Sequence, residues 1–419
     1  MRTYIPRLID QTLKDELEAF GAVLLTGPKW CGKTTTGLNQ AKSFLFLQNP
    51  DEREQILRLA DIKPSLLLEG EKPRLIDEWQ DAPELWDAVR FSIDQKGETG
   101  LYILTGSTTV DESLIAHSGT GRISRLRMRT MSLFESGDSN GEVSVRQLLN
   151  NQEITGKSAH AIEDIANLIV GGGWPGSIGK DVSVKQRQVA GYCNSIINTE
   201  ISTSDGVDRN ADKVGHVLRS YSRHISSQAT ITTITNDVTS SFDSINRKTV
   251  SEYIKALSLI FVIEDLRAWS PMLRSKTAIT TSPTRHFVDP AIAAYFLDAH
   301  PEDLLSDLET MGLLFESLVI RDLRVYADSL GGKLYHYRDR SGLEADAILH
   351  FRNGQWGAFE VKLGNKAIDH GAMSLLKIKE EIDIDAMSPP SFLAVITAEG
   401  FAYQRPDGVY VIPIGCLRN

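Results

Sequence analysis

Residues 22–36 have the sequence AVLLTGPKWCGKTTT, an apolar run followed by a loop of the form G-x-x-x-x-G-K-[ST]. This is the order of strand, loop and helix that a phosphate-binding loop requires. Gly27 and Gly32 permit backbone angles that other residues avoid, so consecutive N–H groups can turn towards an anionic phosphate. The start of the next helix adds partial positive charge, of about half an elementary charge. The alternative is a strand-to-helix turn that matches the motif by chance.

The motif gives roles to single residues. Lys33 is expected to contact the outer phosphates of ATP, and the Thr34 hydroxyl is expected to bind Mg²⁺. Cys31 lies inside the loop, where redox control and a passive position are both open interpretations. The whole loop and the first helical turn are candidate nucleotide-binding residues: Gly27, Pro28, Lys29, Trp30, Cys31, Gly32, Lys33, Thr34 and Thr35.

Two further apolar runs end in polar residues suited to ATP hydrolysis. Residues 73–78, PRLIDE, end in paired acids, and we expect Asp77 to hold Mg²⁺ through its water shell and Glu78 to orient or deprotonate the attacking water. Residues 101–107, LYILTGS, end in Ser107. A strand inserted between the phosphate-loop strand and residues 101–105 would bring Ser107 near the terminal phosphate. An ordinary turn serine is the alternative for Ser107.

Residues 123–130 alternate arginines with apolar residues, which predicts a strand with one basic face. Arg122 precedes this strand and is a candidate to supply positive charge to the transition state, in its own subunit or in a neighbour's. A structural or nucleic-acid-facing arginine is the alternative. A role across subunits would require an oligomer.

Composition bounds the class of protein. A chain of 419 residues predicts two to four domains at ~100–200 residues each. Its 41% apolar and 24% charged residues are typical of a soluble globular protein, and the net charge of −10 means that nucleic acid can be bound only by a local basic face. Three scattered cysteines, no signal peptide and a longest apolar stretch of only 257–263 predict a cytoplasmic protein without a membrane span.

The middle of the chain is predicted to be helical. Residues 136–160 are expected to form a polar loop, and helices are expected over 158–170, 184–201 and 212–226. Between the first two lies GGGWPG, 171–176, whose Gly-x-Pro corner is a candidate to pack on an adenine ring. A helix stop with a core tryptophan is the alternative.

Residues 243–263 predict a helix that starts near Asn246 and a strand over 259–263, an order typical of a winged helix. The segment 246–285 contains seven basic residues and three acidic ones. This local excess of positive charge permits DNA contact without requiring it. The basic residues are Arg247, Lys248, Lys255, Arg267, Arg274, Lys276 and Arg285. A winged helix that serves only for packing is the alternative.

The C-terminal part combines a long helix over 307–327, which carries Glu316, with a hairpin formed by 344–349 and 356–362. Glu360 and Lys362 share one face of their strand, so Asp346 on the partner strand can join them. Two carboxylates suit Mg²⁺, and the lysine suits an activated water at a scissile phosphate. An exposed hairpin with a salt bridge is the alternative.

Taken together, the chain resembles the bacterial and archaeal AAA-like ATPases that carry a C-terminal DUF4143 domain. Residues 27–34 match the Walker A loop of that family, 75–78 the Walker B strand, 104–107 the sensor strand and 342–362 part of the C-terminal domain. The resemblance implies that Asp346, Glu360 and Lys362 fall on a PD-(D/E)xK nuclease motif. Ala345 departs from the family, which commonly has a bulky apolar residue there.

The expected fold class is α/β, with a P-loop NTPase core built on a parallel sheet of the ASCE/AAA-like type. The expected domains are the ATPase core at 1–160, a helical lid at 161–232, a winged-helix-like domain at 233–305 and a nuclease-like α/β domain of restriction-endonuclease type at 306–419. The leading hypothesis is Mg²⁺-dependent ATP hydrolysis that controls a nuclease-like region on DNA. The alternative is a nucleotide-controlled regulatory or interaction protein that does not cleave.

Overall fold

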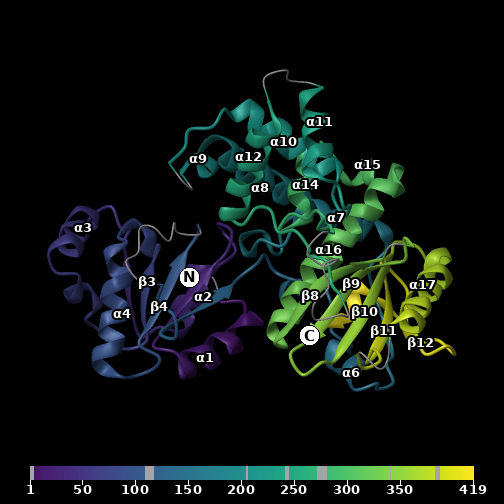
Figure 1. The fold of residues 1–419 in the computed structure, drawn as a ribbon, viewed down its shortest axis with the longest axis horizontal. Helices are drawn as coiled ribbons and strands as arrows, with labels where there is room; N and C mark the ends of the chain where they lie inside the picture. The colour runs from purple at the N-terminus through teal and green to yellow at the C-terminus, as the bar shows by residue number, and fades with distance from the viewer. Residues whose placement is uncertain are drawn as a thin grey trace.

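The computed structural model describes residues 4–108, 118–203, 206–240, 245–270, 281–339, 341–382 and 387–419. These residues form three lobes (Figure 1). The N-terminal lobe is a sheet between helices, the lobe at the top of the view is helical, and the C-terminal lobe is a second sheet with helices. Within the described residues, none of the helices is long and apolar enough to cross a membrane.

The N-terminal lobe contains a five-stranded sheet in the order β2-β3-β4-β1-β5, and every neighbouring pair is parallel. The central strand β1 is apolar and buried almost throughout, as a parallel strand covered on both faces should be. This confirms the α/β class and the parallel sheet of a P-loop core. The strands are β1 (Ala22–Thr26), β2 (Ser43–Phe46), β3 (Arg74–Asp77), β4 (Tyr102–Gly106) and β5 (Ile123–Arg127).

Two expectations about this sheet were wrong. Residues 43–47 do not form a buried strand, because β2 lies at the edge of the sheet, pairs only with β3 and leaves Phe44 exposed. No strand separates β1 from β4, because β4 itself is inserted between β1 and β3. The insertion places the ends of β1, β3 and β4 side by side, which is where the site residues lie.

Helices cover both faces of this sheet. Apolar residues of α3 and α4 pack on one face with Leu24 and Leu104, while Leu13 and Leu17 of α1 pack on the other with Leu25. The helix α2 follows the phosphate loop and packs near β4 and β1. The bounds are α1 (Ile9–Ala19), α2 (Lys33–Gln40), α3 (Arg53–Ile62) and α4 (Glu84–Lys96).

The middle lobe is a bundle of helices. The predicted helices are present with shifted ends, and Asn246 caps α12 through Thr249 N as expected. The described bounds are α7 (Ile162–Gly171), α8 (Val182–Ser195), η5 (Ile196–Glu200), α9 (Ile201–Thr203), α10 (Ala211–Arg223), α11 (Ile231–Thr239), α12 (Arg247–Leu259), α14 (Pro290–Phe296) and α15 (Pro301–Ser306). Asp243 and Ser244, which were grouped with Asn246 at this helix start, lie outside the described residues.

The strand expected over 259–263 was wrong. The chain turns there, with Phe261 at φ 61°. Isolated bridges follow in the described residues, antiparallel from Ile263 to Phe287 and from Leu266 to Thr284, and parallel from Ala268 to His336. The two helices α11 and α12 and these bridges have the order of a winged helix, which stays a prediction. Arg274 and Lys276 of the predicted basic set lie outside the described residues.

The C-terminal lobe is a seven-stranded mixed sheet in the order β7-β12-β13-β11-β10-β9-β8. The predicted hairpin is present as the antiparallel pair β9 and β10. One face packs on α16, in a core that continues into the middle lobe, and the other face packs on α17. The bounds are α16 (Leu308–Ser329), β8 (Gly332–Arg338), β9 (Glu344–Phe351), β10 (Trp356–Lys362), α17 (Ile368–Glu381), β11 (Phe392–Thr397), β12 (Phe401–Gln404) and β13 (Tyr410–Pro413).

Residues 136–160 are not the polar loop expected from their composition. They include β6 (Val143–Ser144), α6 (Val145–Leu149) and β7 (Gly156–Lys157). The strand β7 pairs with β12, and β6 pairs with β14 (Leu417–Arg418), so this segment completes the C-terminal lobe (Figure 1). Long-range pairing, which hydrophobic periodicity does not record, gives these short segments their structure.

Candidate functional site

The phosphate loop lies between β1 and α2 and is closely packed against the next strand. Gly27 has φ 150°, and a Cβ at this position would lie only 2.1 Å from the Met128 carbonyl oxygen. Glycine is therefore required there by both the backbone angle and the space. Lys33 is almost fully buried and donates hydrogen bonds to the carbonyl oxygens of Gly27 (2.9 Å) and Pro28 (3.0 Å). Its ammonium group thus lies over the loop that a phosphate would enter.

Asp77, at the end of β3, faces the first turn of α2. Its Oδ1 accepts hydrogen bonds from the hydroxyls of Thr34 and Thr105, each at 2.7 Å. Burial raises the pKa of Asp77, and the nearby Glu78 carboxylate raises it further. Mg²⁺ in nucleotide sites usually takes one or two protein oxygens together with phosphate and water. The Thr34 hydroxyl and the Asp77 carboxylate fit this need, since they already converge on one point.

Glu78 follows Asp77 in the left-handed region, with φ 54° and ψ 50°. Ser107 Oγ donates a 3.0 Å hydrogen bond to Glu78 Oε2. Gln80 Nε2 contacts the same oxygen. Ser107 therefore positions Glu78. Its expected direct role at the terminal phosphate stays a prediction.

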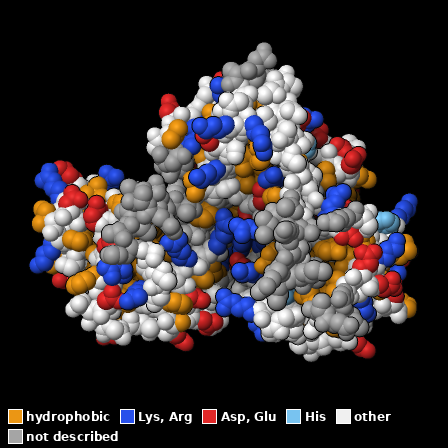
Figure 2. Space-filling model, viewed as in Figure 1, with side chains coloured by type: hydrophobic (Ala, Val, Ile, Leu, Met, Phe, Trp, Pro, Cys, Tyr) orange, Lys and Arg blue, Asp and Glu red, His pale blue; other side chains and the backbone are white. Residues whose placement is uncertain are grey.

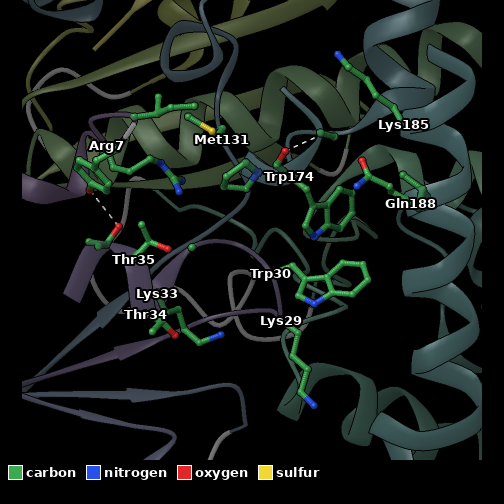
Figure 3. A pocket seen from close by; sticks show the side chains of 18 of the residues that line it. Arg7, Lys29, Trp30, Lys33, Thr34, Thr35, Met131, Trp174, Lys185 and Gln188 are labelled. Atoms are coloured by element: carbon green, nitrogen blue, oxygen red, sulfur yellow. Dashed lines mark hydrogen bonds between the residues drawn. The ribbon is translucent and has the colours of Figure 1, made fainter. Parts of the chain in front are cut away.

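A cavity of about 730 Å³ opens above the phosphate loop. Lys33 and Thr34 line one side, and Trp174 with Pro175 of the Gly-x-Pro corner lines the other (Figure 3). Tyr4, which precedes α1, also lines it. The Trp174 ring is 5% exposed and packs against Tyr192 at 5.0 Å, so it serves both the core and the cavity wall.

Lys29 and Trp30 connect the loop to the middle lobe. Lys29 Nζ makes a 2.7 Å ion pair with Glu200, at the end of η5. Trp30 is 61% exposed and its ring lies 5.9 Å from that of Tyr192 on α8. Cys31 is buried. Two of the predicted nucleotide-binding residues thus contact the helices that cover the cavity.

The structure also brings together the predicted residues of the C-terminal lobe. Lys362 Nζ contacts Glu360 and lies 3.8 Å from Asp346 Oδ2, while Asp346 accepts a 2.7 Å hydrogen bond from Val361 N. Burial and the Asp346 charge raise the pKa of Glu360 to about 8. Burial opposes the charged form of Lys362, but Asp346 and Glu360 outweigh it and raise the pKa of that lysine. Glu316 on α16 is near the same charges, and burial with Asp346 raises its pKa.

These C-terminal carboxylates do not fit a metal ion as well as Asp77 does. Lys362 already forms ion pairs with both acids from between them. Across the described parts of the chain, no group of three or more His, Cys, Asp and Glu side chains is arranged to hold a metal. Metal binding at Asp346 and Glu360 would require Lys362 to move, so it stays a prediction.

Comparison with known proteins agrees with the division into lobes. Residues 19–136 match the family model of an AAA domain, and residues 311–417 match that of the domain of unknown function DUF4143. The chain therefore carries an AAA domain and a DUF4143 domain. The resemblance stated from the sequence is confirmed at both ends. Residues 162–303 match another domain of unknown function, DUF8612.

Among solved structures, a Walker-type ATPase of Pyrococcus abyssi is similar to this chain. It shares 13% sequence identity, with a TM-score of 0.43, over 68% of this chain and 94% of that chain. No curated protein matches the sequence.

Arg7 was missed by the sequence analysis and lies at the base of the AAA domain's phosphate loop. Its guanidinium donates to the carbonyl oxygens of Cys31 (2.8 Å) and Arg129 (2.9 Å) and to Glu135 Oε1 (3.0 Å). Arg7 is only 7% exposed. A lone arginine before a helix gives no signal in the sequence, because the partners of its guanidinium are all distant along the chain.

Buried charges continue from Arg7 to α16 of the DUF4143 domain. Glu135 caps α5 (Leu133–Ser136), whose Leu133 N donates to Asp322 at 2.9 Å. Arg321 binds Asp322 at 2.7 Å and Asp289 at 3.2 Å. Asp289 in turn accepts a 2.9 Å hydrogen bond from Gly173 N, one residue before Trp174. The helix α16 is therefore connected to both sides of the cavity above the phosphate loop.

Arg122 lies too far from the phosphate loop to supply positive charge to a transition state in its own subunit. It precedes β5 at the edge opposite the phosphate loop, where Ala22 N donates to its carbonyl oxygen, and its side chain pairs with Asp94 at 2.9 Å. The five residues of β1 separate Arg122 from that loop. The expectation of a contribution within the same chain was wrong, while a contribution to a neighbouring subunit stays a prediction.

The basic face of β5 is largely occupied by ion pairs. Arg127 and Arg129 both bind Glu264 of the middle lobe, and Arg129 also contacts Asp328 on α16. Burial opposes ionisation of Glu264, but the surrounding arginines outweigh it and hold its pKa well below the usual range. These arginines join the AAA domain to both other lobes.

Proposed function

We propose that the AAA domain binds ATP with Mg²⁺ and hydrolyses it, and that the bound nucleotide controls the middle lobe and the DUF4143 domain. The observation that carries this proposal is the convergence of Thr34 and Asp77 beside Lys33 on a glycine-dependent loop. Convergence of these groups serves phosphoryl transfer, which depends mainly on positioning and electrostatic stabilisation.

In the proposed reaction, the backbone N–H groups of the loop and Lys33 bind the outer phosphates. Bound Mg²⁺ would neutralise charge that develops on the phosphate oxygens. Lys33 would exchange its hydrogen bonds with Gly27 and Pro28 for contacts with phosphate. Glu78, held by Ser107, would orient the attacking water and accept its proton.

The two sides of the cavity offer the means of control. Lys29 binds Glu200 of η5, and Trp174 lies next to Gly173, which Asp289 holds. Nucleotide that pulls on the loop or the Gly-x-Pro corner would therefore move groups bonded to α16. Glu316 lies five residues before Arg321 on this helix, about 7.5 Å along its axis.

The test is Mg²⁺-dependent ATP turnover by the full chain, with and without DNA. Lys33→Ala should abolish turnover and weaken ATP binding by tenfold or more, because a hydrogen bond to a charged group contributes ~1.5–3 kcal/mol. The control is Lys14→Ala, an exposed lysine on α1. Turnover that survives in Lys33→Ala would contradict the proposal.

A second candidate function is metal-dependent cleavage of a phosphodiester by the DUF4143 domain. It is favoured by the meeting of Asp346, Glu360 and Lys362 on β9 and β10. The order α16, β8, β9, β10, α17, β11, with β10 parallel to β11, is that expected for a restriction-endonuclease-like fold. The alternative is a regulatory domain that binds a partner and does not cleave.

Nicking of supercoiled plasmid in the presence of Mg²⁺ or Mn²⁺ separates these candidates. Cleavage should disappear in Glu360→Ala and in Lys362→Ala and persist in Glu380→Ala, an exposed acid on α17. Nicking that persists in both Glu360→Ala and Lys362→Ala would come from a contaminant. The regulatory alternative would then be favoured over cleavage.

A further inference from the structure

A second, larger cavity lies between the AAA domain and the DUF4143 domain, with a volume of about 1170 Å³. One wall is formed by α1 and by β5 with the residues that follow it. The other wall is formed by the end of α16, the start of β8 and the turn between β9 and β10. We call this cavity the interdomain cleft. Lys and Arg side chains gather in the hollow between these two lobes (Figure 2).

The cleft is basic although the protein is acidic. Six arginines and lysines line it, against three carboxylates: Arg7, Arg125, Arg127, Arg129, Lys333 and Arg352 against Glu16, Glu135 and Asp328. Glu135 is paired with Arg7 and Asp328 with Arg129. Lys333 and Arg352 of the DUF4143 domain are exposed, as is Arg125 on the opposite wall. Positive charge therefore faces the cleft from both domains.

A neighbouring cavity of about 560 Å³ extends this surface towards the middle lobe. Both cavities are lined by Arg127, Arg129, Asp328, Lys333 and Tyr335. The second one adds two arginines, Arg324 and the exposed Arg267, together with two carboxylates, Glu264 and Asp265. Arginines and lysines thus line two adjoining cavities and are not confined to a single one. A chain of regularly spaced negative charges fits such an extended surface better than a single small anion does.

Ring side chains accompany the basic residues on the DUF4143 side. Tyr335, His350 and Phe351 line the interdomain cleft and are each partly exposed. Grooves for single strands combine basic residues along the backbone with aromatic rings for the bases. The volume only slightly exceeds the ~300–1,000 Å³ of small-molecule pockets, which suits a few nucleotides of one strand and is too small for a duplex.

We propose that the interdomain cleft binds the sugar–phosphate backbone of a single-stranded nucleic acid, with Lys333 and Arg352 on one wall and Arg125 on the other. This inference gives a location to the nucleic-acid contact that the second candidate function, cleavage of a phosphodiester, would need. It rests on the proposed function in that respect only. Binding in the cleft requires neither ATP hydrolysis nor strand cleavage.

The location differs from the one that the sequence predicts. Arg285 of the predicted winged-helix set is only 5% exposed and its guanidinium binds Asp265 at 2.5 Å. Lys248 lies 3.9 Å from Glu252 on the same helix. Arg267 of that set lines the neighbouring cavity. The basic residues that face a common hollow therefore come from three lobes.

The test is fluorescence anisotropy of the full-length protein with labelled 20-nucleotide single-stranded DNA, single-stranded RNA and duplex DNA. The double variant Lys333→Glu/Arg352→Glu should bind single strands about tenfold or more weakly than the parent. Loss of two phosphate contacts should also reduce the slope of log K against log salt by about 1.4, at ~0.7 for each contact to a single strand. Arg125→Glu tests the opposite wall and should weaken binding in the same direction.

The matched control is Lys14→Glu/Lys379→Glu, which makes the same change in charge at exposed sites on α1 and α17. Its binding should stay within twofold of the parent, and thermal melts should show that all variants fold. Cleft variants that bind as the parent does would overturn the proposal, as would a preference for duplex that the double variant leaves intact. ATP turnover without oligonucleotide is measured separately, so failure of the ATPase proposal is distinguishable from failure of this one.

Discussion

The AAA domain and the DUF4143 domain each place a lysine beside carboxylates, but the two lysines have different partners. Lys33 donates to carbonyl oxygens of its own loop, while Asp77 is held by two hydroxyls. Lys362 is bound by the very carboxylates that a cation would need, Glu360 and Asp346. The first site can accept phosphate and Mg²⁺ by replacing weak neutral contacts, whereas the second must first break an ion pair.

The comparison teaches why the same residue types support different conclusions. A lysine that is hydrogen-bonded to carbonyl groups keeps its charge available for an anion. A lysine between two buried acids is already neutralised, and its removal leaves those acids unpaired. Four predictions follow from this difference.

The largest effect is expected in the AAA domain. Glu78→Gln keeps the shape of the side chain but removes the base, so ATP turnover should fall by ~10²–10⁴-fold while ATP binding is kept. Steady-state turnover and binding of a fluorescent ATP analogue measure the two effects. Glu84→Gln, an exposed acid at the start of α4, is the control. Normal turnover in Glu78→Gln would assign the base to another residue.

A pair of glycines offers a second test. Gly27→Ala should weaken ATP binding by tenfold or more, because the new Cβ would lie 2.1 Å from the Met128 carbonyl oxygen at φ 150°. Gly371 in α17 also lies beside a site, but its Cβ would only touch Glu360 and Lys362 at 3.4 Å. Gly371→Ala should therefore be tolerated, with a gain of up to ~0.5–1 kcal/mol in helix stability. If Gly27→Ala and Gly371→Ala lowered ATP binding and the melting temperature by the same amounts, the two glycines would not differ as proposed.

The two lysines should also differ in stability. Lys362→Met leaves Asp346 and Glu360 without their counter-ion, and we expect a loss of about 2–3 kcal/mol in the free energy of unfolding, discounted for partial exposure. Lys33→Met removes hydrogen bonds to neutral carbonyl groups and leaves no buried charge without its counter-ion, so it should cost less than Lys362→Met. Urea unfolding followed by tryptophan fluorescence measures both, with Lys14→Met as the control. A larger loss in Lys33→Met would reverse the comparison.

Acid should distinguish the two domains least strongly. Burial, together with Arg338, lowers the pKa of His336 on β8 to about 4, although a hydrogen bond to the backbone of Ser282 acts in the opposite direction. The unfolded value is about 6.5. The stability from this neutral histidine is therefore complete above pH 6.5 and is lost as the pH falls through 4.

This loss amounts to about 2 kcal/mol between pH 7 and pH 5. The described part of the AAA domain contains no histidine and should lack this term. Urea midpoints of the parent and of His336→Gln between pH 5 and 7 measure it, and the variant should show the smaller slope. Identical slopes would show that other groups control the response to acid.

Local signals were sufficient to predict which residues the structure brings together at the phosphate loop and in the β9–β10 hairpin. The strand, loop and helix around Gly27 follow one another within fifteen residues, and the hairpin around Asn353 brings Asp346 and Glu360 together by its own register. The fold class and the parallel sheet were predicted for the same reason. A continuous apolar run such as β1 is typical of a buried parallel strand.

Contacts between distant segments could not be predicted. Arg7 reaches Glu135 and Cys31, and Glu264 collects arginines from β5 and α16, without any spacing that records these pairs. Arg122 was misplaced because periodicity predicts a strand and its two faces, but it does not say how that strand runs relative to β1. The end of the sheet at which Arg122 lies therefore could not be predicted. Edge strands are uncertain for a related reason, since Phe44 is exposed only because β2 has no second neighbour.

The pairing of β7 with β12 and of β6 with β14 bears on how the chain is made. Residues 143–157 leave the ribosome about 250 residues before their partners at 401–418, and strands whose partners come much later fold slowly. The AAA domain can fold during synthesis, but the backbone groups of residues 143–157 stay unpaired until β12 and β14 have been synthesised. A fragment cut before residue 306 would keep this exposed segment permanently, so we expect it to aggregate where the whole chain does not.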